Sequence, residues 1–468
     1  MVPIQRRKRP VPTEDDYGAS PEDESPISAL YADDTLALQF SALYADDLRF
    51  VAGWGRWMRW NGHKWAQDTT LHVYDQVRLL CRSAASDAQS AATKRSVASG
   101  KTIASVEKLA RTDRRHALTV TDWDTDQWLL NTPRGIVDLR NGSFASHDRK
   151  RHMTKVTAIS PHGDCPLWKQ FLCDVTNSNA ELQSYIQRVL GYALTGSIRE
   201  HALFFAYGTG ANGKGTLLNT VTAILGDYAI VANAETFTAT NGSRHLTELA
   251  RLQGARFVVA QETEEGKHLA EARIKAITGG DPITANFMRQ DHFTFQPQFK
   301  LFIAGNHKPA LKNVDQAIRR RFNMIPFDVQ IEIEKRDPDL ADKLKAEWPG
   351  ILQWMIDGCL EWQEYRLMPP AAVLDATEEY FEAEDAFGQW MAECCTQRRG
   401  DQGYTMALFN SWKKWCLAAG ELPNSSKRFS QTLAARGFTK KEDRDGKSMF
   451  AGIDLVVPRP YFETDAER

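Results

Sequence analysis

The feature of this sequence that most constrains its fold is a glycine-rich segment lying between an apolar run and a helix-like pattern. His201 to Tyr207 is short, apolar and aromatic, which predicts a buried strand. After the segment, apolar residues recur at helical spacing up to Gly226, a predicted C-cap. The order strand, glycine-rich loop, helix predicts a phosphate-binding loop within an α/β fold. Its predicted ligand-binding residues are Gly208, Thr209, Gly210, Ala211, Asn212, Gly213, Lys214, Gly215 and Thr216.

The residue types in this loop suit a triphosphate. Gly208, Gly210 and Gly213 let the backbone bend so that several N–H groups point at one anion, and the following helix N-terminus adds partial positive charge. Lys214 can reach the β- and γ-phosphates as a mobile cation. We therefore expect ATP as the nucleotide, with Mg²⁺ as its metal. The alternative is a glycine-rich turn that binds no ligand.

The position after the lysine departs from the usual pattern. A Ser or Thr that binds Mg²⁺ normally follows it, but Gly215 stands there and Thr216 comes one residue later. Either Thr216 serves in a shifted loop, or water and acidic groups mainly hold the metal. We predict Thr216 and Glu262 as the metal-binding residues.

Two further predicted strands end in polar side chains. Arg256 to Ala260 is apolar and leads into an acidic run, and a strand ending in carboxylates suits Mg²⁺ and an attacking water. Glu262 is therefore the predicted base, although a solvated acidic turn is the alternative. Lys300 to Gly305 is the third strand, and the Asn306 amide after it can hydrogen-bond the γ-phosphate or the water. A plain Gly-Asn-His turn would give the same pattern.

Three consecutive arginines, Arg319 to Arg321, precede the apolar stretch Met324 to Phe327. A guanidinium is permanently charged and forks onto phosphate. An arginine that reached a neighbouring subunit's ATP would stabilise charge in the transition state. At least one of the three is expected to lie on an ordinary charged helix face instead.

The compact order of these motifs resembles the superfamily 3 helicases, and among them the phage and plasmid primase-helicase family that includes the poxvirus-type enzymes. The stretches that carry the resemblance are 210–214, 252–262, 278–285 and 304–309. The resemblance implies an AAA+-like ATPase core, a hexameric ring with ATP between subunits, and DNA threaded through the centre and unwound. By position, it assigns catalytic roles to Lys214, Glu262 and Asn306, and the finger role to Arg320 or Arg321.

In such helicases a hairpin before the sensor strand contacts DNA with its tip. Residues 283–299 correspond to that hairpin, and Arg289 and His292 could hold a backbone phosphate there. An exposed turn that touches nothing is the alternative. Because no zinc pattern or carboxylate set for nucleotidyl transfer is evident, we expect a helicase without its primase domain, working with a separate primase.

The last part of the sequence predicts a winged-helix arrangement. Helices are expected over 404–416 and 425–436, followed by a hairpin over 438–453 around Asp445-Gly446. Lys427 and Arg428, with Gln431 and Lys440, could meet DNA. A winged helix can equally bind protein, so both readings stay open at this stage.

The overall composition sets further limits. With 58 basic and 60 acidic residues, the net charge of −2 requires phosphate contacts to come from local basic clusters. The apolar runs are too short for a membrane span, so we expect a protein of the bacterial host cytoplasm with no membrane partner. The predicted parts are a disordered tail (1–33), an α+β domain (34–160), a helical collar (161–200), the ATPase core (201–330), a helical lid (331–395) and the winged-helix-like domain (396–468).

Two functions fit these patterns. The first is an ATP-dependent replicative helicase of a phage, plasmid or integrated element, acting as a homo-oligomeric ring. The second is an origin-binding or loading protein in which ATP drives assembly without processive unwinding.

Overall fold

The structure is a computed structural model that describes residues 29–239, 246–261, 268–286, 292–311, 315–420 and 423–456. Most of the predicted tail, the predicted base Glu262 and the hairpin residue Arg289 lie outside the described residues. The chain divides into two compact units: residues 1–138 with 143–160, and residues 139–142 with 161–468. In the described part of the chain, no helix is both long and apolar enough to span a membrane.

The first unit combines a small helical cluster with two sheets. A four-stranded sheet has the order β3 (Trp65–Gln67), β2 (Arg56–Trp60), β1 (Leu48–Val51), β4 (Ala117–Leu118). A three-stranded sheet has the order β5 (Leu129–Thr132), β6 (Gly135–Asp138), β7 (Ser143–Ala145). Apolar side chains of α2 (Asp33–Tyr44), α3 (His72–Asp87) and α5 (Gly100–Ala110) form one buried cluster.

The helical segment over residues 72–110 is interrupted twice. It consists of α3, α4 (Ala91–Val97) and α5. Ser90 caps α4 by accepting from the Thr93 backbone N–H, and Ser99 caps α5 by accepting from the Thr102 N–H. Because a serine hydroxyl satisfies the first free N–H groups of a helix, each serine starts a new helix at its own position. Hydrophobic periodicity alone did not predict these breaks.

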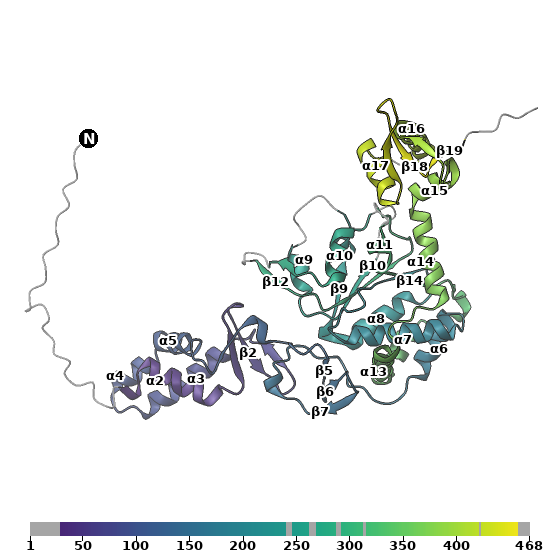
Figure 1. Cartoon of the computed structure of the whole chain (residues 1–468). Helices are drawn as coiled ribbons and strands as arrows, with labels where there is room; N and C mark the ends of the chain where they lie inside the picture. The colour runs from purple at the N-terminus through teal and green to yellow at the C-terminus, as the bar shows by residue number, and fades with distance from the viewer. Residues whose placement is uncertain are drawn as a thin grey trace, which may run out of the picture. The chain divides into compact units, whose positions relative to one another are not determined.

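The second unit is built on a five-stranded, wholly parallel sheet (Figure 1). Its order is β14 (Phe322–Pro326), β8 (Leu203–Tyr207), β13 (Lys300–Gly305), β10 (Phe257–Gln261), β9 (Ala229–Asn233). Gly305 is in register with Tyr207, and Gln261 with Ala304. The loops that follow β8, β13 and β10 therefore leave from the same edge of the sheet. The predicted mixed α/β class with a parallel sheet is confirmed.

The segment predicted as a collar contains two helices. They are α6 (Pro166–Val175) and α7 (Ala180–Leu194), and α13 (Trp348–Tyr365) packs closely on α7. A Cβ on Gly191 would overlap the backbone of Cys359, and one on Gly358 would overlap Gln187, so two glycines allow the close crossing. α13 lies in the segment predicted as a helical lid, and it packs on a helix of the segment predicted as a collar. The sequence did not show which helices would pack together.

Two buried cations fasten α7 to the sheet. The Lys300 ammonium, at the start of β13, donates to the Thr195 carbonyl and to the Ser197 carbonyl at 3.3 Å. Arg256, just before β10, donates to the Leu194 carbonyl at 2.7 Å. Cations suit the carbonyl end of a helix, where the dipole is negative. Burial, and then the nearby Arg256 charge, hold the pKa of Lys300 well below its usual value.

The remaining helices and strands surround the sheet or form the C-terminal part. The core also carries α8 (Lys214–Leu225), α9 (Leu246–Arg251), α10 (Glu271–Gly279), α11 (Gln316–Arg319), α12 (Leu340–Ala346) and α14 (Ala371–Glu384). Beyond α15 (Ala386–Cys394), the C-terminal module contains α16 (Thr405–Ala418) and α17 (Ser426–Ala435). Its sheet has the order β16 (Gln402–Tyr404), β18 (Ser448–Ala451), β17 (Thr439–Glu442), and β15 (Cys395–Thr396) pairs with β19 (Asp454–Leu455).

Candidate nucleotide-binding site

The loop between β8 and α8 requires glycine for steric reasons. Gly210 and Gly213 have φ values of 98° and 83°, a region that L side chains rarely adopt. A Cβ on Gly208 would overlap the Phe327 carbonyl and the Asn212 amide. A Cβ on Gly213 would overlap Val175 of α6. The backbone therefore turns tightly at the point where α8 begins, with the N-terminus of that helix following directly.

Lys214 is the first residue of α8 and is almost fully buried at the base of this loop, 7% exposed. Its ammonium donates to the Gly208 carbonyl at 2.5 Å and to the Asn306 side-chain oxygen at 3.4 Å. Burial lowers the pKa of Lys214 from its usual value. Both acceptors are uncharged oxygens, so the cation has weak partners that an anionic ligand could replace.

Two contacts fix the loop to the segment after β14. The buried Asn212 side chain donates to the Phe327 carbonyl at 2.9 Å, and the Ile331 backbone N–H donates to the Ala211 carbonyl at 3.0 Å. These partners lie more than 110 residues apart in the sequence. Local patterning carries no signal for such a pairing, so the sequence predicted Asn212 only as a loop residue and missed its anchoring role.

A cavity of about 330 Å³ lies beside the loop. One wall is the turn between α6 and α7, with Asn177 and Asn179, and the other follows β14, with Asp328. Val175, which packs against Gly213, also lines it. Asn177 and the adjacent Ser178 have φ values of 51° and 58°, an uncommon conformation for residues other than glycine. A concave space with several polar groups suits one end of a small ligand.

Two of the predicted metal and sensor residues, Thr216 and Asn306, lie within the described residues. Asn306 follows β13, and its side-chain oxygen lies 3.4 Å from the Lys214 ammonium. The sensor role of Asn306 stays a prediction. Thr216 is half-buried in the first turn of α8. A Cβ on Gly215 would meet nothing within 4 Å, so a larger residue fits there. Gln261 ends β10, and Glu262 follows it outside the described residues.

The three arginines have different surroundings. Arg319 is ion-paired with Glu378 of α14 at 2.9 Å. Arg321 is 8% exposed, and its guanidinium donates to the Thr278 hydroxyl at 3.1 Å and to the Ala317 carbonyl. Arg320 is exposed. The geometry therefore separates the two predicted finger residues: Arg321 is occupied inside its own subunit, and Arg320 faces solvent.

The predicted hairpin before β13 is present. Its strands are β11 (Ile283–Ala285) and β12 (Phe293–Phe295), which pair antiparallel with Ile283 opposite Phe295. His292 is exposed immediately before β12. Residues 287–291, including Arg289, lie outside the described residues, so the predicted phosphate contact remains a prediction.

Two segments of the chain match known protein families. Residues 37–177 match a family described as D5 N terminal like, and residues 206–321 match a family of unknown function, DUF5906. The second match contains the glycine-rich loop, Asn306 and the three arginines. The chain is 25% identical over 333 residues to "Putative helicase L207/L206" of Acanthamoeba polyphaga mimivirus, covering 64% of this chain and 34% of that protein. These matches support the viral and phage primase-helicase family for this chain.

Other relatives extend the comparison. The chain is 26% identical over 310 residues to "Putative helicase 022R" of Frog virus 3, covering 61% of this chain and 30% of that protein. The chain thus spans about a third of the length of the curated family members it matches. A solved structure of the NrS-1 C-terminal region, without ligand, aligns with 89% of this chain and 99% of that one at 10% identity and a TM-score of 0.47.

Proposed function

We propose that this chain is the ATP-hydrolysing helicase component of a viral or phage replication machine. The carrying observation is Lys214, which is buried under a glycine-rich loop and lies 3.4 Å from Asn306 at the end of the adjacent strand. A cation and an amide held together at the N-terminus of α8 are the groups that bind and polarise a γ-phosphate. The strand order supports this proposal, because β13 lies directly between β8 and β10.

In the proposed complex the triphosphate lies along the loop from Gly208 to Gly213, and the base end enters the cavity beside Asn177 and Asp328. Lys214 would exchange the Gly208 carbonyl for phosphate oxygens. Asn306 would then be free to orient the attacking water, and Glu262 would accept its proton.

The chain has donors that suit Mg²⁺, although no all-protein cage is expected. Mg²⁺ usually keeps several waters and takes one or two protein oxygens with the phosphates. Thr216 in the first turn of α8 and Glu262 after β10 would supply those oxygens. When bound, the metal neutralises charge that develops on the phosphates during transfer.

The exposed Arg320 supports a ring in which one subunit completes the site of the next. A guanidinium that arrives from a neighbour stabilises charge that the site's own residues cannot reach. We therefore assign the finger role to Arg320, and we assign to Arg321 the role of holding α10 and α11 through Thr278 and Ala317.

The test compares Lys214→Ala with the parent in DNA-stimulated ATP hydrolysis and in displacement of one strand from a forked duplex. Lys335→Ala is a matched control, because Lys335 is an exposed lysine paired with Glu332. We expect both activities to disappear in Lys214→Ala and to persist in the control. Parent protein that turns over ATP without displacing a strand would instead favour the loading function, and unchanged activity in Lys214→Ala would refute the nucleotide site.

A further inference from the structure

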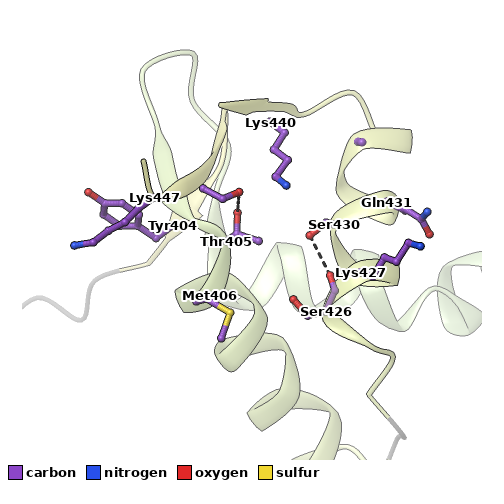
Figure 2. Close-up of a pocket in the computed structure, with 11 residues that line it drawn as sticks. Tyr404, Thr405, Met406, Ser426, Lys427, Ser430, Gln431, Lys440 and Lys447 are labelled. Atoms are coloured by element: carbon purple, nitrogen blue, oxygen red, sulfur yellow. Dashed lines mark hydrogen bonds between the residues drawn. The ribbon is translucent and has the colours of Figure 1, made fainter. Parts of the chain in front are cut away.

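The C-terminal module contains a groove whose walls come from five elements (Figure 2). One wall is α17, and the opposite side is formed by β16, β17, β18 and the first turn of α16. Its volume is about 1110 Å³, slightly above the roughly 300–1,000 Å³ typical of small-molecule sites. The groove is therefore large enough for a segment of a polymer.

The charged side chains that line this groove are all basic. Lys427 comes from α17, Lys440 from β17, and Lys447 precedes β18. Figure 2 shows the Lys440 side chain reaching from its strand into the space in front of α17. None of the described residues that line the groove is acidic, and the other polar lining groups are mainly hydroxyls: Thr405, Ser426, Ser430 and Ser448. Thr405 and Ser448 hydrogen-bond each other at 2.9 Å, and Ser430 donates to the Ser426 carbonyl at 3.0 Å. The lysines are therefore the main groups that could contact a phosphodiester backbone.

One end of the groove carries side chains that can pack against a flat ring. Tyr404 is 46% exposed and Met406 is 60% exposed, and both line the groove. The Tyr404 hydroxyl donates to the Asp443 carboxylate at 2.9 Å, which holds the ring in place. An exposed aromatic ring beside a basic groove stacks well on an unpaired base.

We propose that this groove binds single-stranded DNA, with phosphates on Lys427, Lys440 and Lys447 and a base against Tyr404 and Met406. Unpaired bases expose their faces, whereas bases in a duplex do not, so the Tyr404 end favours a single strand over a double helix. Four residues of this module were predicted to meet DNA, and all of them except Arg428 line the groove. The site is separate from the proposed nucleotide site.

The test measures anisotropy of a labelled oligothymidine with the full chain, without nucleotide, over a series of salt concentrations. Each phosphate contact contributes about 0.7 to the slope of log affinity against log salt for a single strand. Lys440→Ala/Lys447→Ala should therefore lower the slope by about 1.4. The matched control is Lys413→Ala/Lys414→Ala, which removes two exposed lysines from α16 outside the groove and should leave the slope unchanged.

A second measurement uses the same oligonucleotide with bromodeoxyuridine and maps photo-crosslinks by mass spectrometry. We expect the crosslinked peptide to contain Tyr404, and the crosslink to disappear in Tyr404→Ala. Equal salt slopes for the two double variants would overturn the proposal. The proposal would also fail if Lys440→Ala/Lys447→Ala weakened binding of a blunt duplex more than binding of the single strand. Because neither assay contains ATP, a negative result leaves the proposed motor function standing.

Discussion

Replacing Asn212 with alanine tests whether the loop is held by its hydrogen bond to the segment after β14. Asn212 is 3% exposed, and its amide donates to the Phe327 carbonyl at 2.9 Å. Alanine removes that donor and leaves a buried carbonyl without it. Such a loss costs about 1–3 kcal/mol, because the orphaned group keeps its desolvation penalty. A central value of about 2 kcal/mol corresponds to roughly 30-fold in an equilibrium constant.

The loss of about 2 kcal/mol should appear either in the stability of the protein or in its affinity for nucleotide. If the loop leaves its observed conformation only when the protein unfolds, the denaturant midpoint falls and nucleotide affinity is kept. If the loop opens locally, binding of a fluorescent ATP analogue weakens by up to about 30-fold. Asn424→Ala, at an exposed position of the C-terminal module, is the control for both measurements. An Asn212→Ala protein with unchanged midpoint and unchanged affinity would refute the anchoring argument.

Three further outcomes are expected. Gly215→Ser should fold normally, because a side chain at that position meets nothing within 4 Å. The ATPase activity of this variant should saturate at a lower Mg²⁺ concentration than that of the parent. Saturation at a higher Mg²⁺ concentration would contradict a metal site beside this residue. Arg320→Ala should lower ATP turnover about a thousandfold while equilibrium binding of ATP is kept. Arg319→Ala, which breaks a partly exposed ion pair with Glu378, should change ATP turnover little. Equal effects of the two substitutions on turnover would refute the finger assignment. Burial lowers the pKa of Lys214, and a bound anion favours the charged form of this lysine. ATP affinity should therefore decline as the pH rises toward 10.5, and Lys214→Arg should abolish that decline. An identical decline in the arginine variant would show that another group titrates.

The sequence was informative where structure is local. The strand predicted over 300–305 matches β13, and Gly226 follows the end of α8 as its C-cap with a φ of 55°. Each rests on a run of apolar residues or on a glycine at a defined position, which depend on near neighbours. The resemblance of the motif series to the primase-helicase family was confirmed for the same reason, since the motifs are short and ordered.

The sequence was uninformative where distant residues meet. The three arginines are adjacent in the chain, yet one is buried against Thr278, one is paired with Glu378 and one is exposed. Nothing in the triplet distinguishes them, because their burial depends on α10 and α14. The packing of α13 on α7 had the same cause, since an apolar helix face shows that a partner exists without showing which one.

The two ends of β13 contact different parts of the protein. At its amino end Lys300 is buried among carbonyls of the segment after α7, and at its carboxyl end Asn306 touches Lys214 under the loop. β13 is paired with β8 on one side and with β10 on the other, so its two ends belong to one continuous, fully paired strand. One continuous strand therefore joins the segment after α7 to the lysine under the loop, and a nucleotide bound as proposed would contact residues at one end of β13 whose other end contacts the terminus of α7.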